Sequence, residues 1–230
     1  MTDVPEFPEV SPRSGPPRAV LFDLDGVLLD TEPLYTQATE AVIGRFGKCY
    51  GWDLKRHTMG RDARVSARFI LETLDIPLTP DEFLRERAPI LDALLADSPV
   101  FPGVEELLLE LLERRVPIAV ATSSDRRLFE LKTKPHAFFG SFPVIVCGDD
   151  PRVTAKKPAP DIFLAAAKDL GVSPAECVVL EDSPAGVEAA LAAAMRVVAL
   201  PDPAMDRSLY SGAHRILGDR TALTLAALLS

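Results

Sequence analysis

The chain has 230 residues, of which 47% are hydrophobic and 26% are charged, a composition typical of a globular protein with a substantial core. Its formal net charge of −9 argues against a surface that binds nucleic acid or anionic membranes through clustered lysine and arginine. Cys49, Cys147 and Cys177 are scattered without a C-x-x-C spacing, so we expect reduced thiols and a cytoplasmic location.

The N-terminal segment, residues 1–18, is predicted to be a disordered, proline-rich tail. It contains prolines at positions 5, 8, 12, 16 and 17 together with Asp3, Glu6 and Glu9, and such a segment has too little apolar surface to fold. It also lacks the basic start and apolar core of a signal peptide. No stretch approaches the roughly 20 apolar residues that span a bilayer, so we expect no membrane contact.

The short apolar run at 19–22, Ala-Val-Leu-Phe, is predicted to form the first buried strand, and Asp23 and Asp25 follow it. Burying two carboxylates so close together is unfavourable unless a cation lies between them or one of them keeps a proton. An enzyme can use both arrangements, as a metal site beside a nucleophilic carboxylate and as a general acid. The pair therefore suggests phosphoryl-transfer chemistry.

Roughly a hundred residues separate this pair from the next strand end, which is too many for a single crossover helix. Helices are predicted in this interval at 34–46, 65–74 and 82–95. Thr79-Pro80-Asp81-Glu82 supplies the last helix with an N-cap, a proline at the first helical position and a capping-box glutamate. We therefore predict a helical cap at residues 34–100, inserted into a core made of residues 19–33 and 101–230.

Strand and helix patterns alternate after the cap. A helix is predicted at 104–114, strands at about 117–121, 143–147, 177–181 and 196–199, and further helices at about 125–133, 160–170, 184–194 and 221–229. This alternation is typical of an α/β fold with a doubly wound (Rossmann-like) parallel sheet and right-handed crossovers.

Polar groups follow three further strands, as the two aspartates follow the first. Thr122 and Ser123 come at the end of the second strand, Lys157 after the third, and Glu181 and Asp182 at the end of the fourth. Ligands of an open parallel sheet bind outside the carboxyl ends of its strands, so these groups can converge on one crevice. Together they supply what hydrolysis of a phosphate monoester requires: a nucleophile, an acid, phosphate donors and metal-binding carboxylates.

These segments resemble the four motifs of the haloacid dehalogenase superfamily of phosphatases, in the branch whose cap lies between the first two motifs. The motifs are Asp23-x-Asp25-Gly-Val, Thr122, Lys157-Pro-Ala-Pro-Asp161 and Glu181-Asp182-Ser-Pro-Ala-Gly186. Met59-Gly60-Arg61, Leu131-Lys132-Thr133 and Gly148-Asp149-Asp150-Pro151 are similar to the eukaryotic pseudouridine-5′-phosphatases and the plant-type glycerol-phosphate phosphatases. The resemblance covers nearly all of residues 19–217.

The resemblance implies a role for each candidate residue. Asp23 is expected to be the nucleophile, and Asp25 the general acid, which must then carry a proton at first. Asp23, the backbone carbonyl of Asp25, and Asp182 are expected to hold Mg²⁺, which prefers oxygen ligands, while Glu181 reaches the metal through water or orients other ligands. Thr122, Ser123 and Lys157 are expected to bind the phosphoryl group, and Gly60 and Arg61 of the cap to contact the substrate.

Two positions depart from the family pattern. Lys156 stands where the family usually has glycine, which leaves open whether Lys156 or Lys157 points inward. Ala194 stands where related sequences tend to have glycine at the end of a helix. Alanine in a left-handed helix cap costs about 1 kcal/mol, so this helix is expected to end differently.

The predicted function is that of a Mg²⁺-dependent phosphatase for a small phosphorylated metabolite, acting as a monomer. Pseudouridine 5′-phosphate is the first choice of substrate and glycerol phosphate the second. The alternative is a sugar-phosphate mutase of the β-phosphoglucomutase type, which shares all four motifs. A non-catalytic binding protein is disfavoured because Asp23, Asp25 and Asp182 are all present, and a dehalogenase because its chemistry does not need Asp25.

Overall fold

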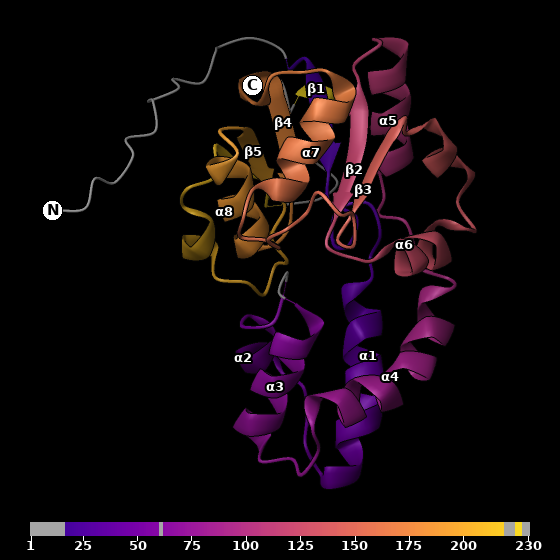
Figure 1. Ribbon diagram of the computed structural model, residues 1–230, viewed down its shortest axis with the longest axis vertical. Helices are drawn as coiled ribbons and strands as arrows, with labels where there is room; N and C mark the ends of the chain where they lie inside the picture. The colour runs from indigo at the N-terminus through magenta and orange to yellow at the C-terminus, as the bar shows by residue number, and fades with distance from the viewer. Residues whose placement is uncertain (1–16, 60–61, 219–223, 227–230) are drawn as a thin grey trace, which may run out of the picture.

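A parallel sheet of six strands lies in the part of the chain that the computed structural model describes, residues 17–59, 62–218 and 224–226 (Figure 1). The strands are β1 (Ala19–Phe22), β2 (Ile118–Thr122), β3 (Val144–Cys147), β4 (Cys177–Glu181), β5 (Arg196–Ala199) and β6 (Arg215–Ile216). Their order across the sheet is β3-β2-β1-β4-β5-β6. The predicted doubly wound α/β sheet is therefore confirmed, and only the two-residue β6 was too short to predict.

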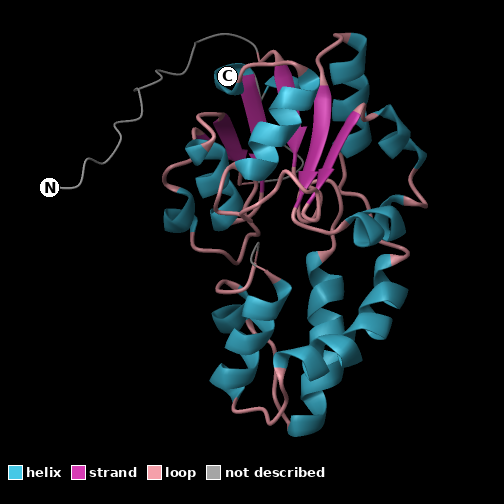
Figure 2. Cartoon of the chain, viewed as in Figure 1, coloured by secondary structure: helices cyan, strands magenta, loops and turns pink. Residues whose placement is uncertain are grey.

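Helices cover both faces of the sheet, as Figure 2 shows. They are α5 (Val104–Glu113), α6 (Arg126–Thr133), α7 (Asp161–Leu170) and α8 (Pro184–Ala192). Alternate residues of β1 point to opposite faces: Val20 and Phe22 pack in the cluster with α5, while Ala19 and Leu21 pack in the cluster with α7 and α8. Because both faces are covered, β1, β2 and β4 are buried at every residue.

A second group of helices lies beyond the carboxyl ends of the strands (Figure 1). It comprises α1 (Glu32–Ile43), α2 (Trp52–Lys55), α3 (Ala63–Leu74) and α4 (Pro80–Leu95). Helix α4 packs against both α1 and α3, around a hydrophobic cluster that includes Ile43, Ile70 and Phe83. We call residues 34–100 the cap, following the sequence prediction, although α1 already begins two residues earlier.

Short 3₁₀ helices join these elements: η1 (Gly44–Phe46), η2 (Ala137–Ser141), η3 (Pro174–Glu176) and η4 (Arg207–Tyr210). The predicted helix at 34–46 thus ends in a 3₁₀ turn, and the four-residue α2 was not predicted. Ala194 does adopt the left-handed conformation, with φ of 57°, and its N–H donates to the Leu191 carbonyl. The expectation of a different helix end was wrong, because the backbone closes the helix as it would with glycine.

Parts of two predicted segments lie outside the described residues. The tail at 1–18 is described only from residue 17, and the closing helix at 221–229 only at 224–226. Across 17–59, 62–218 and 224–226, every helix is too short or too polar to traverse a lipid bilayer.

The N-terminus of α4 gives a direct test of the capping box. The Thr79 hydroxyl accepts a hydrogen bond from the Glu82 N–H at 3.2 Å, and the Glu82 carboxylate accepts one from the Thr79 N–H at 2.8 Å. We expect Thr79→Ala to lower the free energy of unfolding by about 1 kcal/mol, measured by urea denaturation. Ser173→Ala is the control, since Ser173 begins η3 without a side-chain cap bond; equal losses in both variants would contradict the assignment.

Candidate active site

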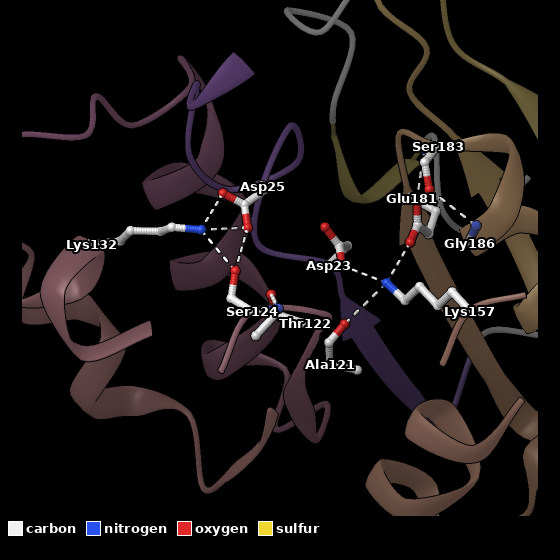
Figure 3. A network of polar contacts seen from close by, with 10 residues as sticks. All are labelled: Asp23, Asp25, Ala121, Thr122, Ser124, Lys132, Lys157, Glu181, Ser183 and Gly186. Carbon is white, nitrogen blue, oxygen red and sulfur yellow. Dashed lines mark hydrogen bonds and ion pairs between the residues drawn. The ribbon is translucent and has the colours of Figure 1, made fainter. Parts of the chain in front are cut away.

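The strand ends bring the predicted residues together at one edge of the sheet (Figure 3). Strand β1 lies between β2 and β4, so Asp23, which follows β1, neighbours Thr122 and Glu181 at the ends of the other two. Lys157 reaches the same place from the loop between β3 and α7. Its Nζ lies 2.5 Å from an Asp23 carboxylate oxygen, 2.6 Å from a Glu181 carboxylate oxygen and 3.4 Å from the Ala121 carbonyl.

Asp23 is a buried carboxylate in a crowded electrostatic environment. Burial raises the pKa of Asp23 to about 7, with Lys157 opposing the shift and the carboxylates of Glu181 and Asp25 adding to it. Burial acts to lower the pKa of Lys157, but the contacts with Asp23 and Glu181 outweigh this and raise it. A single ammonium group is therefore shared between two buried carboxylates, and a further cation would favour the ionised form of Asp23.

Glu181 is held by the start of helix α8. Its second carboxylate oxygen accepts hydrogen bonds from the N–H and hydroxyl of Ser183, at 2.8 and 3.0 Å. A Cβ atom on Gly186 would overlap with this carboxylate, so glycine makes room for it. The sequence left two roles open for Glu181, a contact with the metal through water and the orientation of other ligands. Since both of its carboxylate oxygens have partners, its geometry fits the orienting role.

Asp182 lies against the loop that carries Asp25. A Cβ atom on Gly26 would overlap with the Asp182 carboxylate, and Gly26 has φ of 74°, a conformation that favours glycine. The Tyr210 hydroxyl donates to the Asp182 backbone carbonyl at 2.6 Å, which fixes the chain at this point. The Asp182 side chain and the backbone around Gly26 are therefore adjacent.

The metal hypothesis can be tested against these side chains. No group of three or more His, Cys, Asp or Glu side chains that could hold a metal ion occurs among the described residues. Both carboxylate oxygens of Glu181 and of Asp25 have hydrogen-bond partners, whereas Lys157 contacts a single oxygen of Asp23. Asp23 and Asp182 are therefore the carboxylates that would hold an ion. Mg²⁺ typically binds through one or two carboxylates plus substrate phosphate and water, so this reduced oxygen set still fits it.

Lys132 is a site residue to which the sequence analysis assigned no role. Its buried Nζ lies 2.6 and 2.7 Å from the two carboxylate oxygens of Asp25. The hydroxyls of Thr31 and Ser124 also donate to that carboxylate, at 2.5 and 3.0 Å. The signal in the sequence was a lysine on the inward face of an amphipathic helix, one turn after Phe129.

The Lys132 contact bears on the protonation of Asp25. Burial acts to raise the pKa of Asp25, but Lys132 and the two hydroxyl groups outweigh it, so the pKa lies below its ordinary value. The pKa of Lys132 is raised in turn, because its ion pair with Asp25 outweighs burial. Lys132 and the two hydroxyl groups thus favour the ionised form of Asp25, whereas the acid role predicted from the sequence needs a proton on it.

The remaining predicted residues fall into two groups. Thr122 is buried and its hydroxyl accepts from the Ser124 N–H at 3.1 Å, while Ser123 lies beside it on the cavity wall. A Cβ atom on Gly148 would overlap with the Ser123 carbonyl, so this backbone is closely packed. Gly60 and Arg61 of the cap lie outside the described residues.

The two adjacent lysines point in different directions. Lys157 is buried in the site, whereas Lys156 is exposed and its Nζ lies 3.6 Å from a carboxylate oxygen of Asp62 in the cap. A second ion pair between cap and core joins Asp92 of α4 to Arg127 of α6 at 2.7 Å. Lys157 is thus the lysine of the site, and Lys156 connects the core to the cap.

A cavity of about 300 Å³ lies between the strand ends and the cap. The core side is lined by Asp23, Asp25, Thr122, Lys157 and Asp182 among others, and the cap side by Tyr35, Tyr50, Met59, Arg87 and Leu91 among others. Its volume is at the lower end of the range for small-molecule sites. The carboxylate that we predict to be nucleophilic therefore faces a space that suits a small metabolite.

Comparison with known proteins agrees with this arrangement. Residues 17–194 match the family of haloacid dehalogenase-like hydrolases. A Drosophila melanogaster protein named "Probable pseudouridine-5′-phosphatase" is 43% identical over 201 residues, which cover 86% of this chain and 87% of that protein. The (DL)-glycerol-3-phosphatase 2 of Arabidopsis thaliana is 43% identical over 204 residues, covering 86% of this chain and 85% of the relative.

A solved structure extends the similarity to the whole fold. CbbY from Rhodobacter sphaeroides, crystallised with xylulose-1,5-bisphosphate, superposes with a TM-score of 0.75 at 29% sequence identity. The match covers 92% of this chain and 99% of that one. The helices of the cap are therefore included in the shared arrangement along with the sheet.

Glu32 provides a test of the electrostatics at the cavity wall. Burial raises the pKa of Glu32 to about 7, helped by the carboxylates of Asp25, Asp202 and Asp30 and opposed by Lys55, whose Nζ lies 3.8 Å away. A folded-state pKa above the unfolded value means that stability falls as pH rises from about 4.5 to 7 and stays low above it.

We expect Glu32→Gln to relieve this penalty and to raise the free energy of unfolding at pH 8 by about 1 to 3 kcal/mol. At about pH 3.5, a unit below the ordinary pKa of 4.5, Glu32 is mostly protonated in both states, and the difference from the unmodified protein should largely vanish. Urea denaturation at the two pH values measures it. Glu72→Gln, on the exposed side of α3, is the control, and a gain of equal size at both pH values would contradict the burial argument.

Proposed function

Because this chain belongs to the haloacid dehalogenase-like hydrolases, we propose that it hydrolyses a small phosphate monoester through a phosphorylated Asp23, with Mg²⁺ bound. The enzyme class, a phosphoric monoester hydrolase, follows from the family and from the phosphatases among its relatives. The observation that supports the mechanism best is the position of Asp23, buried at the end of β1, paired with Lys157 and facing the cavity. Asp23 is thereby held in a fixed orientation toward the substrate.

In the first step, a carboxylate oxygen of Asp23 attacks the phosphorus atom and the bond from phosphorus to the ester oxygen breaks. The leaving alkoxide takes a proton from Asp25. In the second step, water gives a proton back to the Asp25 carboxylate and attacks the same phosphorus, which releases phosphate and restores Asp23. Lys157 offsets negative charge beside Asp23 throughout, and the hydroxyl of Thr122 with the N–H of Ser123 can donate to the phosphoryl oxygens.

This scheme requires a change at Asp25, because Lys132 holds that carboxylate ionised in the structure described here. Asp25 must move away from Lys132 and take up a proton before it can act as an acid. Mg²⁺, held by Asp23, Asp182 and the backbone carbonyl of Asp25, would supply positive charge for the phosphoryl oxygens and keep Asp23 ionised.

The cap is the part of the enzyme that we propose selects the substrate and excludes water. Its helices form one wall of the cavity, and the Lys156–Asp62 and Arg127–Asp92 ion pairs hold it against the core. The names of the relatives support pseudouridine 5′-phosphate as the first candidate substrate and glycerol phosphate as the second. Both are small monoesters of a primary hydroxyl group, which a cavity of about 300 Å³ can admit.

The proposal is tested by a panel of monoesters that includes pseudouridine 5′-phosphate, glycerol 3-phosphate and sugar phosphates. With Mg²⁺ present we expect release of inorganic phosphate, which stops when EDTA removes the metal and resumes when Mg²⁺ is restored. An enzyme that turns over no monoester would overturn the proposal. Formation of an isomerised sugar phosphate without phosphate release would instead identify the mutase.

Replacing the nucleophile gives the second test. We expect Asp23→Asn to reduce phosphate release by more than about a thousandfold, because an amide cannot form the phosphorylated intermediate. Asp97→Asn, at an exposed position of the cap, is the matched control and should keep full activity. Circular dichroism checks that both variants are folded, and near-normal turnover of Asp23→Asn would end the assignment.

A further inference from the structure

Arg87 of helix α4 is a cation on the cavity wall that has no ionic partner among the described residues. Its Nε is buried, and no residue in the described part of the chain accepts a hydrogen bond from it. The two buried lysines of the site are paired, Lys157 with two carboxylates and Lys132 with one. Burial lowers the pKa of Arg87, and only the tyrosines Tyr35 and Tyr50 act against this.

Aromatic rings contact the guanidinium group of Arg87, but they do not supply the hydrogen-bond acceptor that its Nε lacks. Its Cζ lies 5.3 Å from the centre of the Phe83 ring and 6.0 Å from that of Tyr35. Such contacts stabilise a cation through the ring faces, but they accept no ordinary N–H hydrogen bond. The Tyr35 ring also lies 5.3 Å from the Nζ of Lys132. Arg87 therefore lies near the catalytic edge of the sheet, on the cap side of the same cavity.

The hydroxyl groups of Tyr50, Thr58 and Ser66, which line this wall, donate within the cap. The Thr58 hydroxyl donates to the Lys55 carbonyl, so in the short contact between Tyr50 and Thr58 the Tyr50 hydroxyl is the donor. The Ser66 hydroxyl donates to the Thr58 carbonyl. These hydroxyl protons are thus used inside the cap, and their oxygens can only accept from a ligand. Arg87 is the cation that the cap contributes to the lining of the cavity without a carboxylate partner among the described residues.

We propose that Arg87 binds the part of the substrate that faces the cap, and that this part carries carbonyl oxygens, as a uracil base does, and not only hydroxyl groups. The inference rests on the proposed phosphatase function. A guanidinium group is donor-only and planar, so two sp² oxygens or one carbonyl match it well. A polyol oxygen can accept one such hydrogen bond, but it does not present a planar pair of acceptors to the guanidinium fork.

The proposal predicts a substrate-dependent loss when Arg87 is replaced. The substrates are pseudouridine 5′-phosphate, glycerol 3-phosphate, and phenyl phosphate, whose leaving group has no carbonyl. We expect Arg87→Met to lower kcat/KM for pseudouridine 5′-phosphate by about a hundredfold, mainly through KM, and to change the other two by less than about threefold. Arg87→Lys should recover part of the loss, since it keeps the charge without the planar fork.

The matched control is Arg85→Met, two residues away on the exposed side of α4, which should resemble the unmodified enzyme on all three substrates. Equal losses on all three substrates in Arg87→Met would indicate a merely structural role and overturn the proposal. The proposal would also be overturned if the unmodified enzyme did not prefer pseudouridine 5′-phosphate over glycerol 3-phosphate. The same holds if the Arg87→Met variant kept that preference.

A binding measurement separates failure of this inference from failure of the proposed function. If the unmodified protein hydrolyses none of the three esters, the phosphatase proposal fails. Calorimetric titration with the nucleoside pseudouridine then decides the role of Arg87 on its own. Binding that is weakened at least tenfold in Arg87→Met, but not in Arg85→Met, would support it; absent or unchanged binding would overturn it.

Discussion

The site depends on two buried lysines that balance carboxylates held at the ends of parallel strands. Lys157 contacts Asp23 and Glu181, and Lys132 contacts Asp25. Without these ammonium groups, three carboxylates would share a poorly solvated crevice, which is strongly unfavourable. The lysines are 134 and 107 positions from their aspartate partners along the chain. The arrangement of charge at the site therefore forms only when the sheet and its crossover helices are complete.

The two lysines act on their partners in different ways. Lys157 is shared between two carboxylates, so it only partly opposes the effect of burial, and the pKa of Asp23 stays raised. Lys132 serves one carboxylate together with two hydroxyl groups, and the pKa of Asp25 is lowered. An added cation would favour the ionised form of Asp23, which the proposed nucleophile needs. Asp25 must leave Lys132 before it can act as the proposed acid. Both requirements fit a site that is completed by metal and substrate. This is how the electrostatics of the free protein relate to the proposed reaction.

The cap differs from the core in how its charges are compensated. In the core, Lys157 and Lys132 contact the buried carboxylates of Asp23, Glu181 and Asp25, and these contacts fix the groups whatever the leaving group is. The cap instead places Arg87 on the cavity wall with aromatic contacts and no carboxylate among the described residues. A charge left without a partner is one that a ligand can satisfy, so we propose that the cap recognises the leaving group and the core carries out phosphoryl transfer. The cap–core ion pairs at Asp62 and Asp92 lie on exposed surface and contribute modestly to holding the two together.

Local patterns in the chain predict the sheet, the inserted helices and the strand-end positions of Asp23, Thr122, Glu181 and Asp182, because periodicity, caps and turns are local properties. They also place Lys157 in the loop that follows the third strand. The folded protein alone shows that Lys157 and not Lys156 turns inward, that Lys132 pairs with Asp25, and that Glu181 is held by Ser183. It also shows that Arg87 reaches the cavity. These facts depend on contacts between segments far apart in the chain, where the direction of one side chain is set by the charge and packing of others, and no local pattern contains that information.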